Sequence, residues 1–304
     1  MAKTTFSGPV RSRNGFQHVD SVGSDFTTRG GLDMRRYTLE EYWKQRPALN
    51  AVIGTAFSNA DATNAANTAI RVAEMIANKD FEVLGTNMTT ALVTFSATRS
   101  GIVLTTAGAD EDQAILAPHL DTNQSAWQVT EWGTENQVQW EASVSTGASI
   151  ADIKIWAGLK LTNDQLIATD ADQAYFLFET DGDNGTALTD FTLLHFVYSV
   201  GGVDYISALP VTVAAATTYH LRIEIDDARK ATIFVNGVQY DVSNTSGSTG
   251  GTAVASVNAG RPAVKSNALT NDIDLIPYVG VESGAVADAI ITVHYQGISR
   301  IHFE

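Results

Sequence analysis

The sequence of 304 residues contains no cysteine. A disulfide framework and a thiolate metal site are therefore both excluded. It also contains no run of about 18 apolar residues, the length that a membrane-spanning helix requires. The opening Met-Ala-Lys-Thr-Thr lacks the apolar segment of a secretory signal. We therefore expect a soluble protein that is made and kept in a cytoplasm-like compartment.

The common catalytic motifs are missing as well. There is no Gly-x-Ser-x-Gly turn, no phosphate-binding glycine loop and no His-Glu-x-x-His pair. The histidines are dispersed, and none has a partner at metal-ligand spacing; they are His18, His119, His195, His220, His294 and His302. We therefore expect neither an enzyme nor a bound cofactor.

Positive charge is scarce and unevenly spread. The chain has 19 Lys/Arg against 34 Asp/Glu, a formal net charge of −15. Residues 1–50 hold eight Lys/Arg against five Asp/Glu, a net of +3, whereas residues 51–304 hold eleven against 29, a net of −18. An acidic body argues against nucleic acid as its partner. The acidity serves solubility alone, or it keeps the body in solvent while a cationic N-terminal arm docks on an acidic surface.

The residues that are abundant suit β-structure. A hydrophobic fraction of 44%, 24 glycines and six prolines are typical of many short strands joined by turns. From about Phe81 onward, apolar and polar residues alternate with the two-residue period of half-buried strands. The alternating segments are 91–96, 101–105, 137–144, 153–161, 174–179, 192–199, 203–207, 275–281, 289–295 and 298–303. This pattern predicts a mainly β protein with an antiparallel two-sheet jelly-roll sandwich over residues 86–304.

The clearest strands lie in residues 219–242. Leu221, Ile223 and Ile225 alternate with polar residues, and a second strand follows a short polar connection. Asn236-Gly237 then predicts a tight hairpin, because a type I′ turn needs positive φ at both central positions. We expect this three-stranded meander to lie at the centre of the sandwich. Residues 243–272 are rich in Ser, Gly and Thr and predict a long surface loop.

Residues 1–50 are predicted to form an extended N-terminal arm. Residues 1–36 show neither the helical nor the strand period, and single apolar residues are scattered among turn signals. Such a segment is either disordered or ordered by lying across another protein. The spacing of its aromatic residues favours the second alternative. The expected partner-binding residues are Phe6, Val10, Arg11, Arg13, Phe16, Phe26, Arg29, Arg35 and Arg36.

Two helices are expected between the arm and the sandwich. Thr38 and Glu41 have the spacing of a capping box, which predicts a short helix over residues 39–45 that Pro47 closes. Small residues at three- and four-residue steps predict a longer helix over residues 59–79, within a helical linker 51–85. This helix packs either on its own sandwich or at a subunit contact.

The densest acidic cluster is residues 179–185. Glu179, Asp181 and Asp183 at two-residue steps suggest the carboxylate pair of a glycoside hydrolase, but Gly182 indicates that the strand has already turned. Asp181 and Asp183 are also weak candidates for a cation site, although Thr192 stands where an EF-hand loop has glutamate. The third and favoured interpretation is a solvated turn without a metal.

Four tryptophans lie early in the β region: Trp127, Trp132, Trp140 and Trp156. Aromatic rings stack on sugars, so Trp127, Trp132 and Trp156 are candidate glycan-binding residues. Tryptophans also fill sandwich cores, which is their commoner use.

Several segments together suggest a family. The segments 155–163, 168–176, 213–225, 234–237 and 275–280 resemble the concanavalin/laminin-G-like jelly-roll domains of tailed-phage virion proteins. The opening Thr-Phe-Ser-Gly-Pro-Val-Arg-Ser-Arg-Asn-Gly-Phe at residues 5–16 resembles the leader of structural proteins from phages of marine bacteria. Nothing in the chain resembles the main shell protein of tailed phages.

The resemblance implies a non-enzymatic virion structural protein, a capsid decoration or cement protein. It implies assembly in the host bacterial cytoplasm, a place on the outer capsid surface, the major capsid protein of the same virion as partner, and a homo-oligomer, with a trimer favoured. It supplies no catalytic residues and no cofactor, and it implies neither a nucleic-acid nor a membrane partner. The alternative is a tail- or fibre-associated module that binds host glycan.

Overall fold

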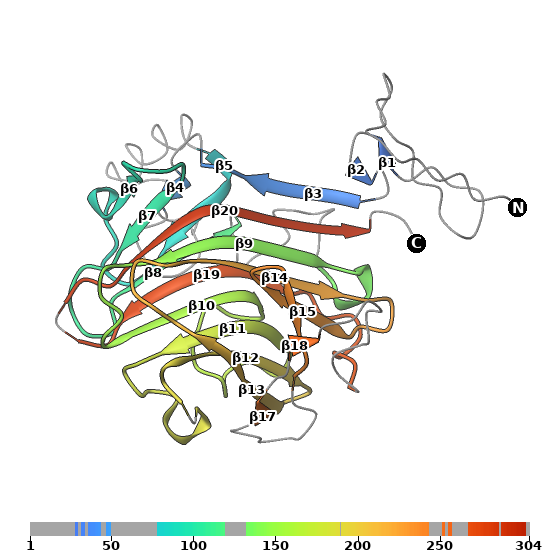
Figure 1. Cartoon of the computed structure of the whole chain (residues 1–304). Helices are drawn as coiled ribbons and strands as arrows, with labels where there is room; N and C mark the ends of the chain where they lie inside the picture. The colour runs from blue at the N-terminus through green and yellow to red at the C-terminus, as the bar shows by residue number, and fades with distance from the viewer. Residues whose placement is uncertain are drawn as a thin grey trace, which may run out of the picture.

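In the described part of the computed structural model, regular secondary structure is almost entirely β-strand (Figure 1). The structure describes residues 28–29, 32–33, 36–43, 47–49, 78–118, 132–188, 190–242, 251–252, 255–256, 267–285 and 287–301. Helical structure in this part is limited to three-residue 3-10 turns, η2 (Thr90–Leu92), η4 (Thr134–Asn136) and η5 (Gly185–Ala187). None of the helices found there has the length and hydrophobicity needed to cross a membrane.

Two large sheets contain nearly all of the strands. The first, which we call the β20 sheet, has the order β18-β16-β15-β14-β9-β20-β7-β6, and β3 also pairs with β20. Its strands are β3 (Arg36–Glu41), β6 (Val93–Phe95), β7 (Ile102–Thr105), β9 (Gln139–Thr146), β14 (Thr218–Ile225), β15 (Ala231–Val235), β16 (Val238–Tyr240), β18 (Ala255–Ser256) and β20 (Ile290–Ile301). All its pairings are antiparallel.

The second sheet, which we call the β10 sheet, has the order β17-β13-β12-β11-β10-β19-β8-β5-β4. Its strands are β4 (Pro47–Leu49), β5 (Asn78–Leu84), β8 (Gln113–Pro118), β10 (Ile153–Lys160), β11 (Gln173–Glu179), β12 (Leu193–Val200), β13 (Val203–Thr212), β17 (Gly251–Thr252) and β19 (Ile276–Ser283). Only the two outermost pairings, β4 with β5 and β13 with β17, are parallel. A small hairpin, β1 (Thr28–Arg29) with β2 (Leu32–Asp33), belongs to neither sheet.

The sheets pack face to face, and their inner faces form the main core. Trp140 of β9, Ile223 of β14 and Phe176 of β11 are among its buried side chains. A smaller apolar cluster covers the outer face of the β10 sheet, where Trp156 and Tyr175 pack with Ile167 and Leu188 from connecting segments. The β10 sheet is therefore buried on both faces, whereas the outer face of the β20 sheet carries the polar half of each alternating strand. The predicted two-sheet antiparallel sandwich is confirmed.

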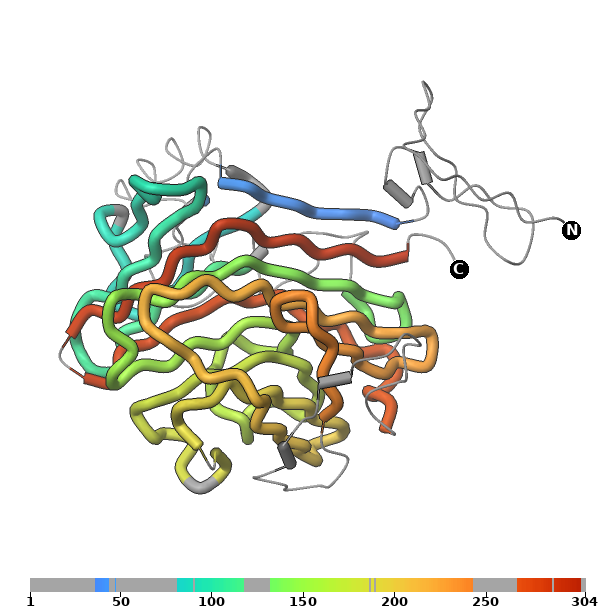
Figure 2. Tube along the Cα trace, viewed as in Figure 1, coloured from blue at the N-terminus to red at the C-terminus, as the bar shows by residue number. Residues whose placement is uncertain are grey.

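The predicted meander forms as β14, β15 and β16. Asn236 and Gly237 have φ values of 51° and 77°, as the type I′ turn requires. Its place in the sheet differs from the prediction, because β14 is central while β15 and β16 lead to the β18 edge. The middle positions of the order belong to β14 and β9, and β9 pairs with β20 along most of its length (Figure 2).

The predicted helix over residues 39–45 is not formed. Residues 36–41 are strand β3, which pairs with the end of β20 from Arg36 opposite Ile301 to Glu41 opposite Gln296. Leu39 is buried against the core, so tertiary pairing outweighs the local capping preference. The helix predicted for residues 59–79 lies outside the described residues, except that its last two residues begin strand β5. Residues 78–84 of the predicted linker are thus part of the β10 sheet.

Candidate functional site

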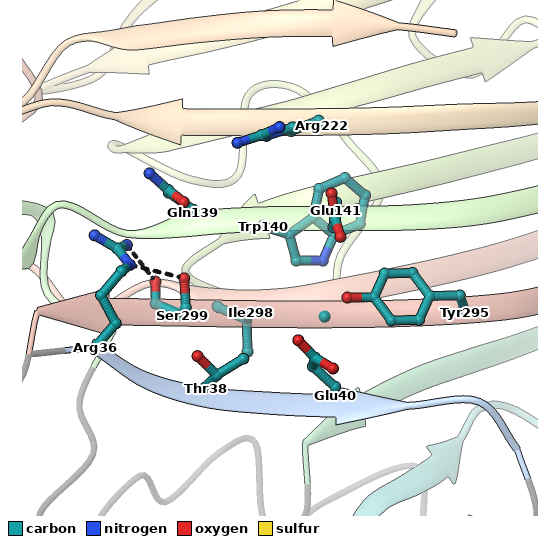
Figure 3. Close-up of a pocket in the computed structure, with 11 residues that line it drawn as sticks. Arg36, Thr38, Glu40, Gln139, Trp140, Glu141, Arg222, Tyr295, Ile298 and Ser299 are labelled. Carbon is teal, nitrogen blue, oxygen red and sulfur yellow. Dashed lines mark hydrogen bonds between the residues drawn. The ribbon is translucent and has the colours of Figure 1, made fainter. Parts of the chain in front are cut away.

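The outer face of the β20 sheet carries a shallow groove with a volume of about 450 Å³ (Figure 3). Strands β3, β20, β9 and β14 lie side by side beneath it, so residues far apart in the sequence meet there. The lining residues are Arg36, Thr38, Glu40, Gln139, Trp140, Glu141, Arg222, Tyr295, Gly297, Ile298 and Ser299. Most of them are polar, because outward positions of a half-buried sheet face water.

A β-bulge in β20 shapes this groove. Val293 pairs with Val144 and Tyr295 pairs with Ser143, so His294 is one extra residue on the β20 side. Without the extra residue, Tyr295 would point to the core like Val293, which is completely buried. The bulge instead brings Tyr295 to the outer face, as such irregularities commonly do beside functional sites.

The ring of Tyr295 lies along its own strand over Gly297. A Cβ atom at position 297 would lie only 2.3 Å from the Tyr295 hydroxyl oxygen, so glycine is what permits this placement. Tyr42 lies against the same ring, with the two ring centroids 4.7 Å apart. The groove therefore offers an aromatic surface bordered by polar side chains.

Charged groups control the protonation of this tyrosine. Burial, the negative charge of Glu141 and a hydrogen bond to that carboxylate raise the pKa of Tyr295, and Glu40 adds to the effect. The phenol is therefore protonated, and a hydrogen-bond donor, beyond the pH at which a free tyrosine ionises. On β14, the guanidinium of Arg222 contacts the carboxylate of Glu224 and lies 5.7 Å from the ring centroid of Phe234. Donors and acceptors thus alternate across the groove, as binding of a polar ligand requires.

Arg36, which the sequence placed among the arm residues that bind a partner, is engaged within its own chain. Its guanidinium donates to the hydroxyl and the carbonyl oxygen of Ser299 at 3.1 and 3.2 Å, and to the carbonyl oxygen of Gln137 at 2.5 Å. This contact fixes the start of β3 beside the end of β20, so Arg36 is a residue of the sheet, and its contact with a partner stays a prediction. For Arg29 only the backbone is described. The remaining predicted arm residues, Phe6, Val10, Arg11, Arg13, Phe16, Phe26 and Arg35, lie outside the described residues.

The tryptophans do not gather in a glycan site. Trp156 is fully buried beneath the outer face of the β10 sheet, and Trp132 is 4% exposed in the main core, where its ring lies 5.9 Å from that of Tyr37. Neither ring has the free surface needed to stack on a sugar, so both are corrected from candidate ligand contacts to core residues. Trp127 lies outside the described residues.

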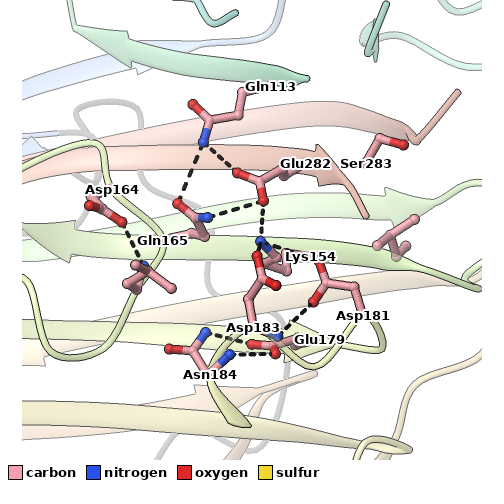
Figure 4. A network of polar contacts seen from close by, with 12 residues as sticks. Gln113, Lys154, Asp164, Gln165, Glu179, Asp181, Asp183, Asn184, Glu282 and Ser283 are labelled. Carbon is pink, nitrogen blue, oxygen red and sulfur yellow. Dashed lines mark hydrogen bonds and ion pairs between the residues drawn. The ribbon is translucent and has the colours of Figure 1, made fainter. Parts of the chain in front are cut away.

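The acidic cluster of residues 179–185 surrounds a lysine (Figure 4). Asp181, Asp183 and Glu282 bring oxygen atoms within 4.8 Å of one another, which is the spacing of a metal site. The ammonium group of Lys154 lies among them, 3.2 Å from Asp181 and in direct contact with Asp183 and Glu282. Burial opposes the charge of Lys154, but the contacts with Asp183, Glu282 and Asp181 outweigh it and raise the pKa of this lysine. The cluster already contains its cation.

Glu179 is not placed as a catalytic acid. Its carboxylate accepts hydrogen bonds from the backbone and the side chain of Asn184, and its side chain is buried. Burial raises the pKa of Glu179, against the effect of those hydrogen bonds. Because Glu179, Asp181 and Glu282 are all enclosed, the paired carboxylates suggested by the sequence do not line an open cleft.

The sequence missed the groove because its residues come from four strands. Tyr295 ended the predicted strand 289–295, and Gly297 lay between it and the predicted strand 298–303. The interruption at residues 296–297 was the local signal that this strand is irregular near the bulge at His294.

Fold and site together define an antiparallel β-sandwich with one covered and one open, polar face. No protein-family model and no curated protein matches the sequence. Solved structures with a similar arrangement include a protein of unknown function from Shewanella oneidensis MR-1, with 8% identity, a TM-score of 0.45, and coverage of 87% of this chain and 86% of that chain. The carbohydrate recognition domain of Emp47p has 11% identity and a TM-score of 0.42, and the match covers 74% of this chain and 90% of that chain. A peanut lectin with a 9mer peptide has 10% identity and a TM-score of 0.41, and the match covers 87% of this chain and 97% of that chain. These values are too low to support an argument about function.

Proposed function

We propose that the protein is a virion structural protein, a capsid decoration or cement protein that attaches to the assembled shell through residues 1–35. The observation that supports the proposal is that the first strand of the sandwich begins at Arg36. β3 is tied into the β20 sheet from Arg36 onward, and the described core is built from residues that follow it. In this proposal, the cationic and aromatic residues that precede Arg36 bind a partner, the major capsid protein of the same virion.

Physical considerations favour such a division of roles. A ligand that binds only the assembled shell stabilises it by mass action, and many copies on one lattice allow each contact to be weak. Ordering an irregular leader costs entropy, which apolar anchors and charge pairing offset. The acidic body then faces solvent on the outer capsid surface, and a homo-oligomer, in first place a trimer, adds to the avidity.

A deletion of residues 2–35 tests the proposal. The shortened protein should keep its circular dichroism spectrum and melting temperature but no longer cosediment with purified capsids that lack decoration. Fusion of residues 1–35 to an unrelated soluble carrier should confer binding to the same capsids. Full binding by the shortened protein would refute attachment through the leader.

Glycan binding at the groove over Gly297 is the second candidate function. The observation that favours it is the combination of the Tyr295 ring with carboxylate, amide and guanidinium groups on adjacent strands. A glycan array separates the two functions, because decoration predicts no specific glycan. Tyr295→Ala and Glu141→Gln should abolish any glycan signal, whereas Val203→Ala, at an exposed position of the β10 sheet, should not change it.

A further inference from the structure

A second hollow of about 450 Å³ lies on the same outer face, beside the bulge. In it the Ser145 hydroxyl of β9 is 2.7 Å from Nε2 of His294 and 2.7 Å from the Thr218 hydroxyl of β14. Nδ1 of His294 is 2.6 Å from the carbonyl oxygen of Ser100. Nη1 of Arg99 is 3.4 Å from the Thr218 hydroxyl. Five groups thus form one continuous hydrogen-bonded chain.

The two ends of this chain determine where its protons lie. A carbonyl oxygen only accepts, so Nδ1 of His294 carries the proton that it donates to Ser100. In the neutral ring Nε2 then has a free lone pair, and Ser145 donates to it. Since the Ser145 proton is committed to His294, Thr218 donates to the Ser145 oxygen, and Arg99, which can only donate, donates to Thr218. The arrangement is a hydroxyl held against an imidazole base that a third group orients.

Two backbone features bring these groups together. The bulge inserts His294 into β20 next to Val293 and places its ring on the outer face. Gly101, with φ of 144°, allows the preceding segment to approach, because a Cβ there would lie 2.9 Å from Nδ1 of His294 and 2.8 Å from the carbonyl oxygen of Val293. A larger residue at position 101 would therefore push the Ser100 carbonyl away from the histidine.

We propose that Ser145 is a nucleophile activated by His294 and that this hollow hydrolyses short-chain acyl esters of polar alcohols. The Ser145 oxygen attacks the ester carbonyl while its proton passes to Nε2 of His294. The alcohol leaves with that proton as the bond between the acyl carbon and its oxygen breaks. Water then attacks the acyl-serine, gives a proton to His294, and releases the carboxylic acid as Ser145 recovers its proton. Arg99 supplies positive charge beside the developing oxyanion.

The lining defines the class of ester. Apart from Ala216, the side chains around the hollow are hydroxyls, Arg99 and His294, so nothing there would bind a long acyl chain. A short acyl group, such as acetyl, and an alcohol that can form hydrogen bonds fit this surface. The activity is additional to capsid attachment and does not depend on it.

The test uses the full-length protein, a fluorophosphonate probe and p-nitrophenyl acetate. The probe should phosphonylate Ser145, with loss of fluoride, as located by mass spectrometry, and the ester should release p-nitrophenol over many turnovers. Ser145→Ala should abolish both reactions, and His294→Gln should slow both by about 100-fold. Ser149→Ala should leave both unchanged, because this exposed hydroxyl lies outside the hollow and accepts from the Ala151 amide instead of facing a base.

Thr218→Val keeps a β-branched side chain and serves if His294→Gln does not fold. It should slow labelling by about 10-fold, because Ser145 loses the hydrogen bond that orients its hydroxyl toward His294. Labelling of Ser145 no faster than that of Ser149, or hydrolysis that persists in Ser145→Ala, would overturn the proposal. Release of a single equivalent of p-nitrophenol would overturn the hydrolytic step. The Ser145→Ala variant should attach to capsids as well as the wild type does. The esterase test and the capsid-attachment test can therefore fail independently of each other.

Discussion

His294 and Tyr295 are consecutive in the chain, yet both side chains reach the outer face of the β20 sheet. Alternation along a regular strand would send one of them into the core. The extra residue between the pairs Val293–Val144 and Tyr295–Ser143 removes this conflict. One irregularity therefore shapes two neighbouring sites, the groove over Gly297 and the hollow around Ser145.

A buried histidine is expected to make stability depend on pH. His195 of β12 is fully buried between its cross-strand neighbours Leu177 and Ala208, and burial lowers its pKa to about 4 from the usual 6.5. The neutral form of His195 contributes fully to the free energy of unfolding above about pH 6.5. This contribution is lost as the pH falls toward 4, because between these two pH values only the unfolded chain takes up the proton.

Between pH 7 and 4 we expect the free energy of unfolding to fall by on the order of 3 kcal/mol because of His195. Urea unfolding of wild type and His195→Leu at intervals between pH 7 and 4 measures it, and the variant should show a flatter profile. His220→Leu, at an exposed position of β14, is the control and should keep the wild-type profile. Identical profiles for His195→Leu and wild type would contradict the assignment.

Lys154 is expected to be essential for stability. Lys154→Met leaves Asp181, Asp183 and Glu282 without their cation, and removal of one partner from a buried ionic group costs about 3–5 kcal/mol. Denaturant unfolding measures the loss. Lys230→Met, in the half-buried turn before β15, should cost less than about 0.5 kcal/mol.

The same cluster makes a prediction about metals. Because the Lys154 ammonium occupies the space between the three carboxylates, neither EDTA nor millimolar calcium should change the melting temperature of the wild-type protein. A calcium-dependent rise in the wild type would show that a metal competes with the lysine.

Two glycines on different strands should respond differently to a methyl group. A Cβ at Gly280 would lie 2.3 Å from the buried Trp156 ring, so Gly280→Ala should destabilise the fold by about 1–3 kcal/mol. The nearest atoms to a Cβ at Gly297 all belong to the outer end of the half-exposed Tyr295 side chain, which can turn away, so Gly297→Ala should alter the groove at little cost in stability. Thermal melts compare the two variants, and equal losses would contradict the described packing.

Substitutions at Arg36 and in the leader should have different effects. Arg36→Ala removes the contacts with Ser299 and Gln137, so amide hydrogens of residues 36–41 should exchange faster while capsid binding persists. Arg11→Ala with Arg13→Ala should weaken capsid binding without changing that exchange. Loss of capsid binding in Arg36→Ala, with unchanged exchange, would return this residue to the arm.

The sequence alone determined most of the strands of the body. The two-residue alternation places Leu221, Ile223 and Ile225 in the core, and Asn236-Gly237 specifies its own turn, because these features depend on residues adjacent in the chain. The same local reasoning failed for residues 36–41, where Thr38 and Glu41 favour a helix but pairing with β20 imposes a strand.

Only the tertiary structure decided which polar residues meet. Lys154, Asp181 and Glu282 come from distant segments, as do Ser145 and His294, and no spacing in the sequence relates them. The covering of Trp156 likewise depends on connecting segments that fold back over the β10 sheet. Strand patterns are local, whereas the contacts that make a site depend on sheet order and on a single bulge in β20.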